Sequence, residues 1–144
     1  MESHLSDISR VIQLAVAPVF LLTAIATLIS AMNARLGRIV DRRRVVQERL
    51  SGLGGDLLAA SQEELCLLSR RSRLIYFAIF CAVLGALLVC LVVAGAFVGA
   101  LLGVDLARMV ASLFVLAMCS MIAGLGLFLR EVYLAVLTGT HANR

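Results

Sequence analysis

The chain has 144 residues, of which 62% are hydrophobic and 15% are charged, and its mean hydropathy is +1.03. Globular proteins average roughly 45–50% apolar and about 25% charged residues, and a soluble domain of this length has too little interior for such an excess. The composition therefore excludes an ordinary soluble domain and indicates a membrane protein. The formal net charge is +4, from thirteen basic and nine acidic residues. All thirteen basic residues are arginines, because the sequence contains no lysine.

The first apolar run covers residues 11–32 and carries no charge. About 20 apolar helical residues cross a bilayer core of about 30 Å, so this run predicts a first membrane-spanning helix. It is longer than the apolar core of a cleavable signal peptide, and the residues before it include Glu2, Asp7 and only one arginine, Arg10. These features favour a retained anchor.

Residues 33–73 form the one long polar segment and hold nine of the thirteen arginines. Apolar residues keep helical spacing in both halves of this segment. Between the halves lies SGLGGD, residues 51–56, whose glycines end a helix and whose Asp56 can cap the next one. We predict two antiparallel helices that continue the first and second spans, with a turn at 51–56.

Two further apolar runs follow, and we place the second span at 74–102 and the third at 109–129. A short turn at 103–108 joins them, and a tail occupies 130–144. The expected fold class is an all-α integral membrane protein, a single membrane domain over 1–144. It has three transmembrane helices and a cytoplasmic antiparallel helical hairpin between the first and second spans.

The distribution of arginine predicts the orientation, because arginine-rich short loops stay in the cytoplasm. With residues 33–73 and the C-terminal tail inside, eleven arginines lie inside and two, Arg10 and Arg108, lie outside. We therefore expect the N-terminus outside, the turn at 103–108 outside and the C-terminus in the cytoplasm.

Residues 11–50 are predicted to form one long helix, since only Pro18 interrupts the pattern and membrane spans tolerate proline. At about 100° per residue, polar side chains gather on one side of this helix. This polar seam comprises Gln13, Thr23, Thr27, Ser30, Arg35, Arg38, Asp41, Arg42 and Arg49.

Two interpretations of the polar seam remain open. In the first, the hydroxyl groups and small residues pack against neighbouring helices, and the arginines are solvated or paired with acids such as Glu63 and Glu64. In the second, the polar seam lines a water-filled path at the centre of an oligomer, with arginine rings at its inner mouth. Four polar residues in the span are within what packing alone requires.

Gly95, Gly99 and Gly103 recur every four residues on one face, a spacing that lets helices approach closely in lipid. We expect these glycines to mediate helix packing, within one chain or between chains. Because three spans make a thin bundle, we also expect a homo-oligomer of undetermined symmetry.

Motifs for other functions are missing from the sequence. The four cysteines include no CxxC pair, so no metal site is expected, and no cofactor-binding or catalytic constellation is present. Nucleic-acid binding is not expected, because topology explains the arginines and they lack an aromatic stacking platform. The chain is therefore not expected to be an enzyme.

The stretch APVFLLTAIATLISAMNARLGRIVDRRR resembles a family of small bacterial membrane proteins catalogued as domain of unknown function 2721. Pro18, Phe20, Leu21 and Leu22 carry the resemblance in the first span, and Arg35, Leu36, Arg38, Ile39, Asp41 and Arg42 carry it in the segment that follows. The resemblance implies a three-helix protein of the bacterial inner membrane, and it implies no activity.

Our first functional hypothesis is an oligomeric inner-membrane channel or passive conduit whose first helix lines the path. The alternative is a membrane-anchored interaction or scaffold protein. In that case the arginine-rich cytoplasmic hairpin binds a protein partner or anionic lipids. The other expected partners are the lipid bilayer and further copies of the chain.

Overall fold

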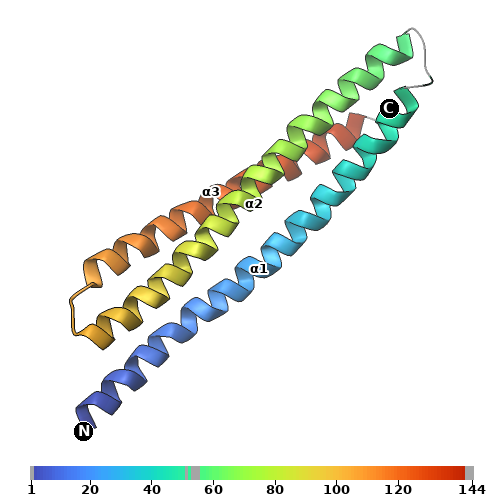
Figure 1. Ribbon diagram of the computed structural model, residues 1–144. Helices are drawn as coiled ribbons and strands as arrows, with labels where there is room; N and C mark the ends of the chain where they lie inside the picture. The colour runs from blue at the N-terminus through green and yellow to red at the C-terminus, as the bar shows by residue number, and fades with distance from the viewer. Residues whose placement is uncertain (1, 51, 53–55, 142–144) are drawn as a thin grey trace. The chain divides into compact units, whose positions relative to one another are not determined.

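The computed structural model describes residues 2–50, 52 and 56–141, which form three helices (Figure 1). They are α1 (Glu2–Leu50), α2 (Asp56–Leu102) and α3 (Ala107–His141), and these described residues contain no strand. Each helix includes a segment long and apolar enough, by length and composition, to cross a membrane. The predicted all-α class and the three long apolar helices are confirmed.

α1 continues through Pro18 without a break, which confirms the single helix predicted over residues 11–50. Gly52 follows its C-terminus, and the Gly52 amide donates a hydrogen bond to the Arg49 carbonyl oxygen at 3.1 Å. The first helix therefore ends where the glycine-rich stretch begins. Apart from Gly52 and the start of α2, the turn predicted at 51–56 lies outside the described residues.

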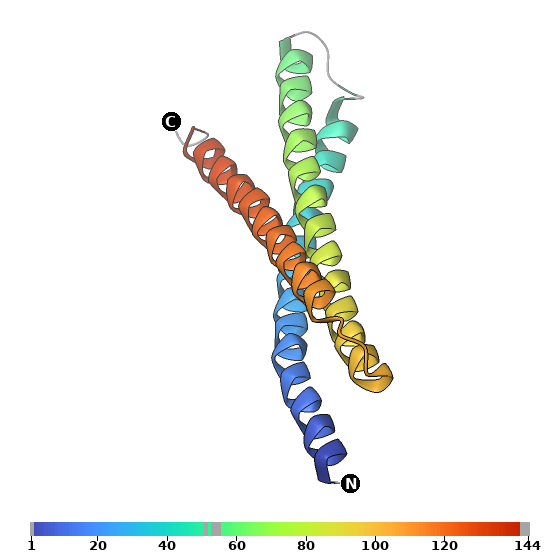
Figure 2. The same cartoon turned by 90° about the vertical axis from the view of Figure 1, so that its left-hand side faces the viewer.

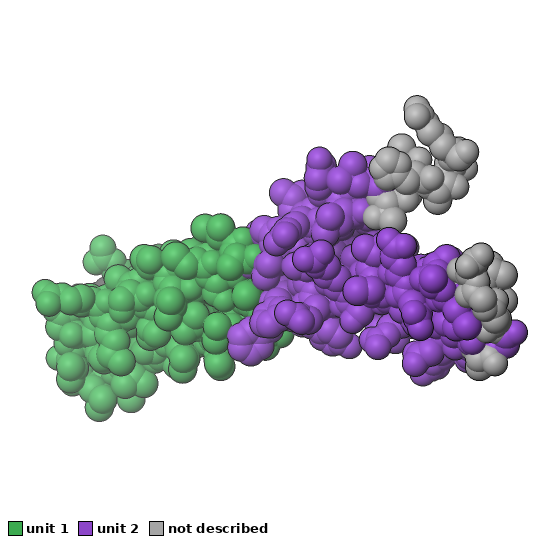
Figure 3. Space-filling view, turned by 90° about the horizontal axis from the view of Figure 1, so that it is seen from above, with its two compact units in different colours: residues 1–29, 81–123 green, residues 30–80, 124–144 purple. Residues whose placement is uncertain are grey.

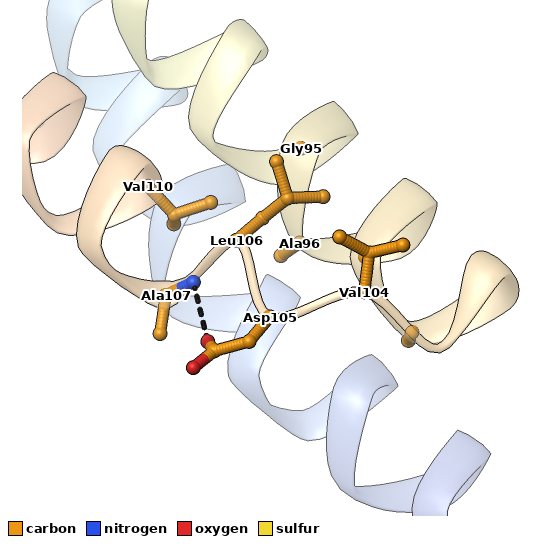
Figure 4. Close-up of a pocket in the computed structure, with 9 residues that line it drawn as sticks. Gly95, Ala96, Val104, Asp105, Leu106, Ala107 and Val110 are labelled. Atoms are coloured by element: carbon orange, nitrogen blue, oxygen red, sulfur yellow. Dashed lines mark hydrogen bonds between the residues drawn. The ribbon is translucent and has the colours of Figure 1, made fainter.

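α2 and α3 are joined by a four-residue turn that begins with a glycine in a left-handed conformation. Gly103 has a φ of +64°, and the Val104 amide donates to the Gly99 carbonyl oxygen at 3.2 Å, which ends α2 in a Schellman arrangement. The Asp105 carboxylate then accepts a hydrogen bond from the Ala107 amide at 3.1 Å and caps α3 (Figure 4). The turn, which was predicted at 103–108, therefore covers only residues 103–106 in the structure.

The residues divide into two compact units, coloured separately in Figure 3. Unit 1 comprises residues 1–29 and 81–123, and unit 2 comprises residues 30–80 and 124–144. Each unit contains one stretch of every helix.

Buried positions recur every seven residues along each helix. Two helical turns take about 7.2 residues, so such an interval returns to nearly the same face. α1 and α3 are therefore buried along a narrow stripe, as expected for helices whose remaining surface lipid can cover. α2 is buried over a wider face, which also includes Ser72, Ala78, Gly85, Leu88 and Val92. The stripe residues are Ile25, Met32, Ile39 and Val46 on α1, Leu68, Ile75, Ala82 and Val89 on α2, and Ala117, Gly124 and Glu131 on α3.

Small residues bring α2 and α3 close together in unit 1. A Cβ atom added at Gly85 would lie 3.0 Å from the Met121 side chain, and Ala117 is completely buried beside Leu88 and Val89. The Ser120 hydroxyl donates a hydrogen bond to the Cys81 carbonyl oxygen at 2.7 Å. These contacts hold the two helices of the pair in register.

In unit 2, α3 leaves the other two helices towards its C-terminal end. Figure 2 shows the red end of α3 diverging from the green part of α2. The side chains of Tyr133 and Val136 are exposed there. The last position at which α3 is buried in this unit is Glu131, and this residue is an acid.

Candidate functional site

Glu131 is the only charged residue that is buried among the described side chains, and it is 1% exposed. It occupies the position on α3 where the seven-residue interval would otherwise place a small or apolar residue. Removing a carboxylate from water is costly unless charged hydrogen-bond donors compensate it. The surroundings of Glu131 supply two such donors.

Arg35 of α1 and Arg71 of α2 both bind the Glu131 carboxylate. Arg35 donates from Nη1 to Oε2 at 2.7 Å. Arg71 donates to Oε1 from Nη2 at 2.9 Å and from Nε at 3.3 Å. Both carboxylate oxygens are therefore satisfied by charged donors, and no buried side-chain polar atom in the described structure lacks a partner.

The Arg35–Glu131–Arg71 cluster contains one residue from each helix and so links all three within unit 2. The Arg35 guanidinium also lies over the Phe128 ring, 5.7 Å from its centroid, one turn before Glu131 on α3. A guanidinium suits both contacts, since its planar fork matches a carboxylate and its face stacks on aromatic rings. The cluster is a charged junction between the three helices.

The structure places eight of the nine residues of the predicted polar seam on exposed positions of α1, and the ninth, Arg35, is half-buried. Arg35 lies half-buried in the cluster, and Arg42 pairs with Glu64 of α2 through Nε at 3.0 Å and Nη2 at 2.9 Å. The Arg42–Glu64 pair agrees with the packing interpretation. Arg42 is itself exposed, as are Gln13, Thr23, Thr27, Ser30, Arg38, Asp41 and Arg49.

The hydroxyl groups of the two threonines in the polar seam donate hydrogen bonds to carbonyl oxygens of α1 itself. The Thr23 hydroxyl donates to the Val19 carbonyl oxygen at 3.2 Å, and the Thr27 hydroxyl donates to the Thr23 carbonyl oxygen at 3.0 Å. Such bonds to the preceding turn are a common arrangement for threonine in helices. These hydroxyls therefore need no partner from another helix.

Two of the three predicted packing glycines lie against α3 or the turn before it. A Cβ atom at Gly95 would come within 3.2 Å of the Val110 side chain, and one at Gly99 within 3.3 Å of Leu106 and of the Val104 carbonyl oxygen. Gly103 meets no neighbour within 4 Å and serves the turn instead. Gly95 and Gly99 also line a shallow hollow beside that turn (Figure 4), whose one carboxylate, that of Asp105, is used as the cap of α3.

Sequence reasoning missed Glu131, because it lies two residues beyond the predicted end of the third span and was placed in the tail. Two signals point to it. It is the only acid in α3, and it follows Ala117 and Gly124 at intervals of seven residues. The described residues bring no three His, Cys, Asp or Glu side chains together as a metal site would require.

The three long apolar helices are typical of a small multi-pass membrane protein. The chain belongs to the family described as protein of unknown function DUF2721, whose model matches residues 15–139. No curated protein and no solved structure matches the chain.

Proposed function

We propose that the protein is a membrane-anchored interaction protein of the bacterial inner membrane, which presents arginine-rich helices to an acidic protein partner in the cytoplasm. In this proposal residues 33–73 and the C-terminus lie in the cytoplasm, and the N-terminus and the turn after α2 lie outside. The supporting observation is that the arginines occupy two different environments. Arg35 and Arg71 hold the cluster, while Arg43, Arg44 and Arg49 are exposed near the end of α1.

The positions of these arginines favour binding over simple solvation of the helix. The buried stripe continues through Ile39 and Val46, so α1 keeps one face packed as far as the exposed arginines. A helix held in this way presents its charges with less loss of conformational freedom than a mobile tail would. An acidic surface of a partner is the complementary chemistry.

A charge reversal tests this proposal. The double variant Arg43→Glu and Arg44→Glu should abolish co-purification of cytoplasmic partners from membranes solubilised in mild detergent. The control is Arg108→Glu, an exposed arginine in the first turn of α3, at the end of the helix that we place outside. An unchanged set of partners for the double variant, with helical content and yield equal to wild type, would refute the proposal.

A homo-oligomeric channel is the second candidate, and one observation favours it. Gln13, Thr23, Thr27 and Ser30 are exposed on α1, so lipid, water or another copy must contact them in a membrane. If α1 lines a path between copies, the purified protein should be oligomeric and should conduct in planar bilayers, and Thr27→Val should change the conductance. A silent monomer would eliminate this candidate.

A further inference from the structure

The contacts of the Arg35–Glu131–Arg71 cluster bring three positions of unit 2, one on each helix, to a similar height along the helix axes. Because a helix rises 1.5 Å per residue, arginines within three positions of a cluster residue lie within about 5 Å of that height along the helix axis. Six arginines satisfy this condition. We call them the arginine collar: Arg35, Arg38, Arg70, Arg71, Arg73 and Arg130.

The arginine collar has far more positive than negative charge. Within it the only acid is Glu131, and the next along α1 is Asp41, one turn beyond Arg38. Glu64, the nearest acid before the collar on α2, is already paired with Arg42. The collar thus contains six guanidinium groups and one carboxylate, and the excess positive charge attracts an anion.

The collar arginines are accessible to such an anion. Arg38, Arg70, Arg73 and Arg130 are exposed, and the cluster arginines Arg35 and Arg71 keep 33% and 23% of their side-chain surface accessible. Glu131 receives bonds from one nitrogen of Arg35 and two of Arg71. Each guanidinium therefore retains further N–H groups for an anionic oxygen.

An exposed apolar surface adjoins the arginine collar on the side of the uncharged runs. Tyr76, Phe77 and Phe80 on α2 and Leu129 on α3 are exposed within about two turns of the collar, on the side of the uncharged runs. Each of these runs, residues 11–32, 74–104 and 109–129, has one of its two ends beside the collar. A ligand that fits both surfaces has an anionic head and an apolar body.

We propose that the arginine collar binds the phosphate groups of anionic phospholipids, whose acyl chains lie along the exposed apolar residues next to it. Arginine pairs with phosphate oxygens through two parallel N–H donors, and basic residues beside a span bind anionic headgroups. The inference deepens the proposed function, since it rests on the same placement in the membrane, but it concerns a different set of arginines from the partner-binding pair.

Native mass spectrometry of the full-length protein in detergent tests the collar, with phosphatidylglycerol and phosphatidylcholine of identical acyl chains as probes. Wild type should retain phosphatidylglycerol in preference. The double variant Arg70→Gln and Arg73→Gln should bind it more weakly, by about fivefold for each arginine removed. The matched control, Arg43→Gln and Arg44→Gln, removes the same charge beyond the collar and should change binding by less than about twofold. Arg130→Gln, on a different helix, gives a second reading if the double variant does not fold.

Three results would overturn the proposal. Equal retention of the two lipids by wild type would show no preference for the anionic headgroup. Equal weakening by the collar and control variants would show an effect of net charge alone. Binding of sn-glycerol 3-phosphate as tight as that of phosphatidylglycerol would show a site for a free phosphate compound. Absence of any lipid preference in wild type, with partner binding retained, would refute only the lipid proposal, because partner binding is measured with Arg43 and Arg44.

Discussion

At the scale of single residues, Glu131 is the only buried charged side chain of the described structure. Its carboxylate is buried and is held by Arg35 and Arg71, which remain about a third and a quarter exposed. The loss of one partner of a buried ion pair leaves an uncompensated charge, whereas an exposed pair contributes little. Glu131 and Glu64 illustrate the two cases in one unit.

We expect Glu131→Gln to lower the free energy of unfolding by about 3 kcal/mol, near the lower limit for buried pairs because both arginines keep some contact with solvent. Glu64→Gln removes the carboxylate from the exposed pair with Arg42 and should cost less than about 1 kcal/mol. Unfolding of the purified protein in one detergent, followed by circular dichroism, compares the two variants. Equal losses would contradict the assignment of Glu131 as the buried junction.

At the scale of the helices, glycines have different roles according to their backbone conformation and neighbours. Gly37 is exposed within α1, and a Cβ atom there would meet nothing within 4 Å. Gly103 also has open space, but its φ of +64° is one that other residues adopt only at a cost. Open space alone therefore does not predict the effect of a substitution.

Replacement of each of these glycines by alanine should have opposite effects. Gly37→Ala should stabilise the protein by roughly 0.5–1 kcal/mol, because alanine loses less backbone entropy in a helix. Gly103→Ala should destabilise it by about 1 kcal/mol, because of the left-handed conformation. Thermal unfolding midpoints of the two variants in the same detergent test this. A change of the same sign in both would be inconsistent with the turn described at Gly103.

At the scale of the whole chain, we propose an orientation in the membrane from the placement of the arginines, and the native cysteines offer a direct test. Cys66 is exposed in the segment that we place in the cytoplasm, whereas Cys81, Cys90 and Cys119 lie in segments that we place in the bilayer. In a variant that keeps only Cys66, a membrane-impermeant maleimide should label inside-out vesicles and leave right-side-out vesicles unlabelled. With Asp105→Cys as the only cysteine, labelling should follow the reverse pattern. The same pattern for both cysteines would contradict the orientation.

The sequence predicts the helices well because their signals are local. Apolar runs identify α1, α2 and α3, and Gly103 lies at the break between the last two. The charged junction was not predicted, because it depends on which side chains of distant segments meet. Helical periodicity places Arg35 and Arg42 on one polar face, but it does not show that Arg35 reaches α3 while Arg42 reaches α2. The seven-residue interval that ends at Glu131 is present in the sequence. Its significance depends on the buried stripe, which only the structure shows.

A double-mutant cycle on Glu131 and Arg71 tests most directly whether this one buried carboxylate joins the helices. If the two side chains interact as described, the double variant Glu131→Gln and Arg71→Gln should lose about 1–3 kcal/mol less stability than the sum of the two single variants. The same cycle on Glu131 and the exposed Arg73 should give additive losses. Additivity within about 0.5 kcal/mol for Glu131 and Arg71 would contradict the junction.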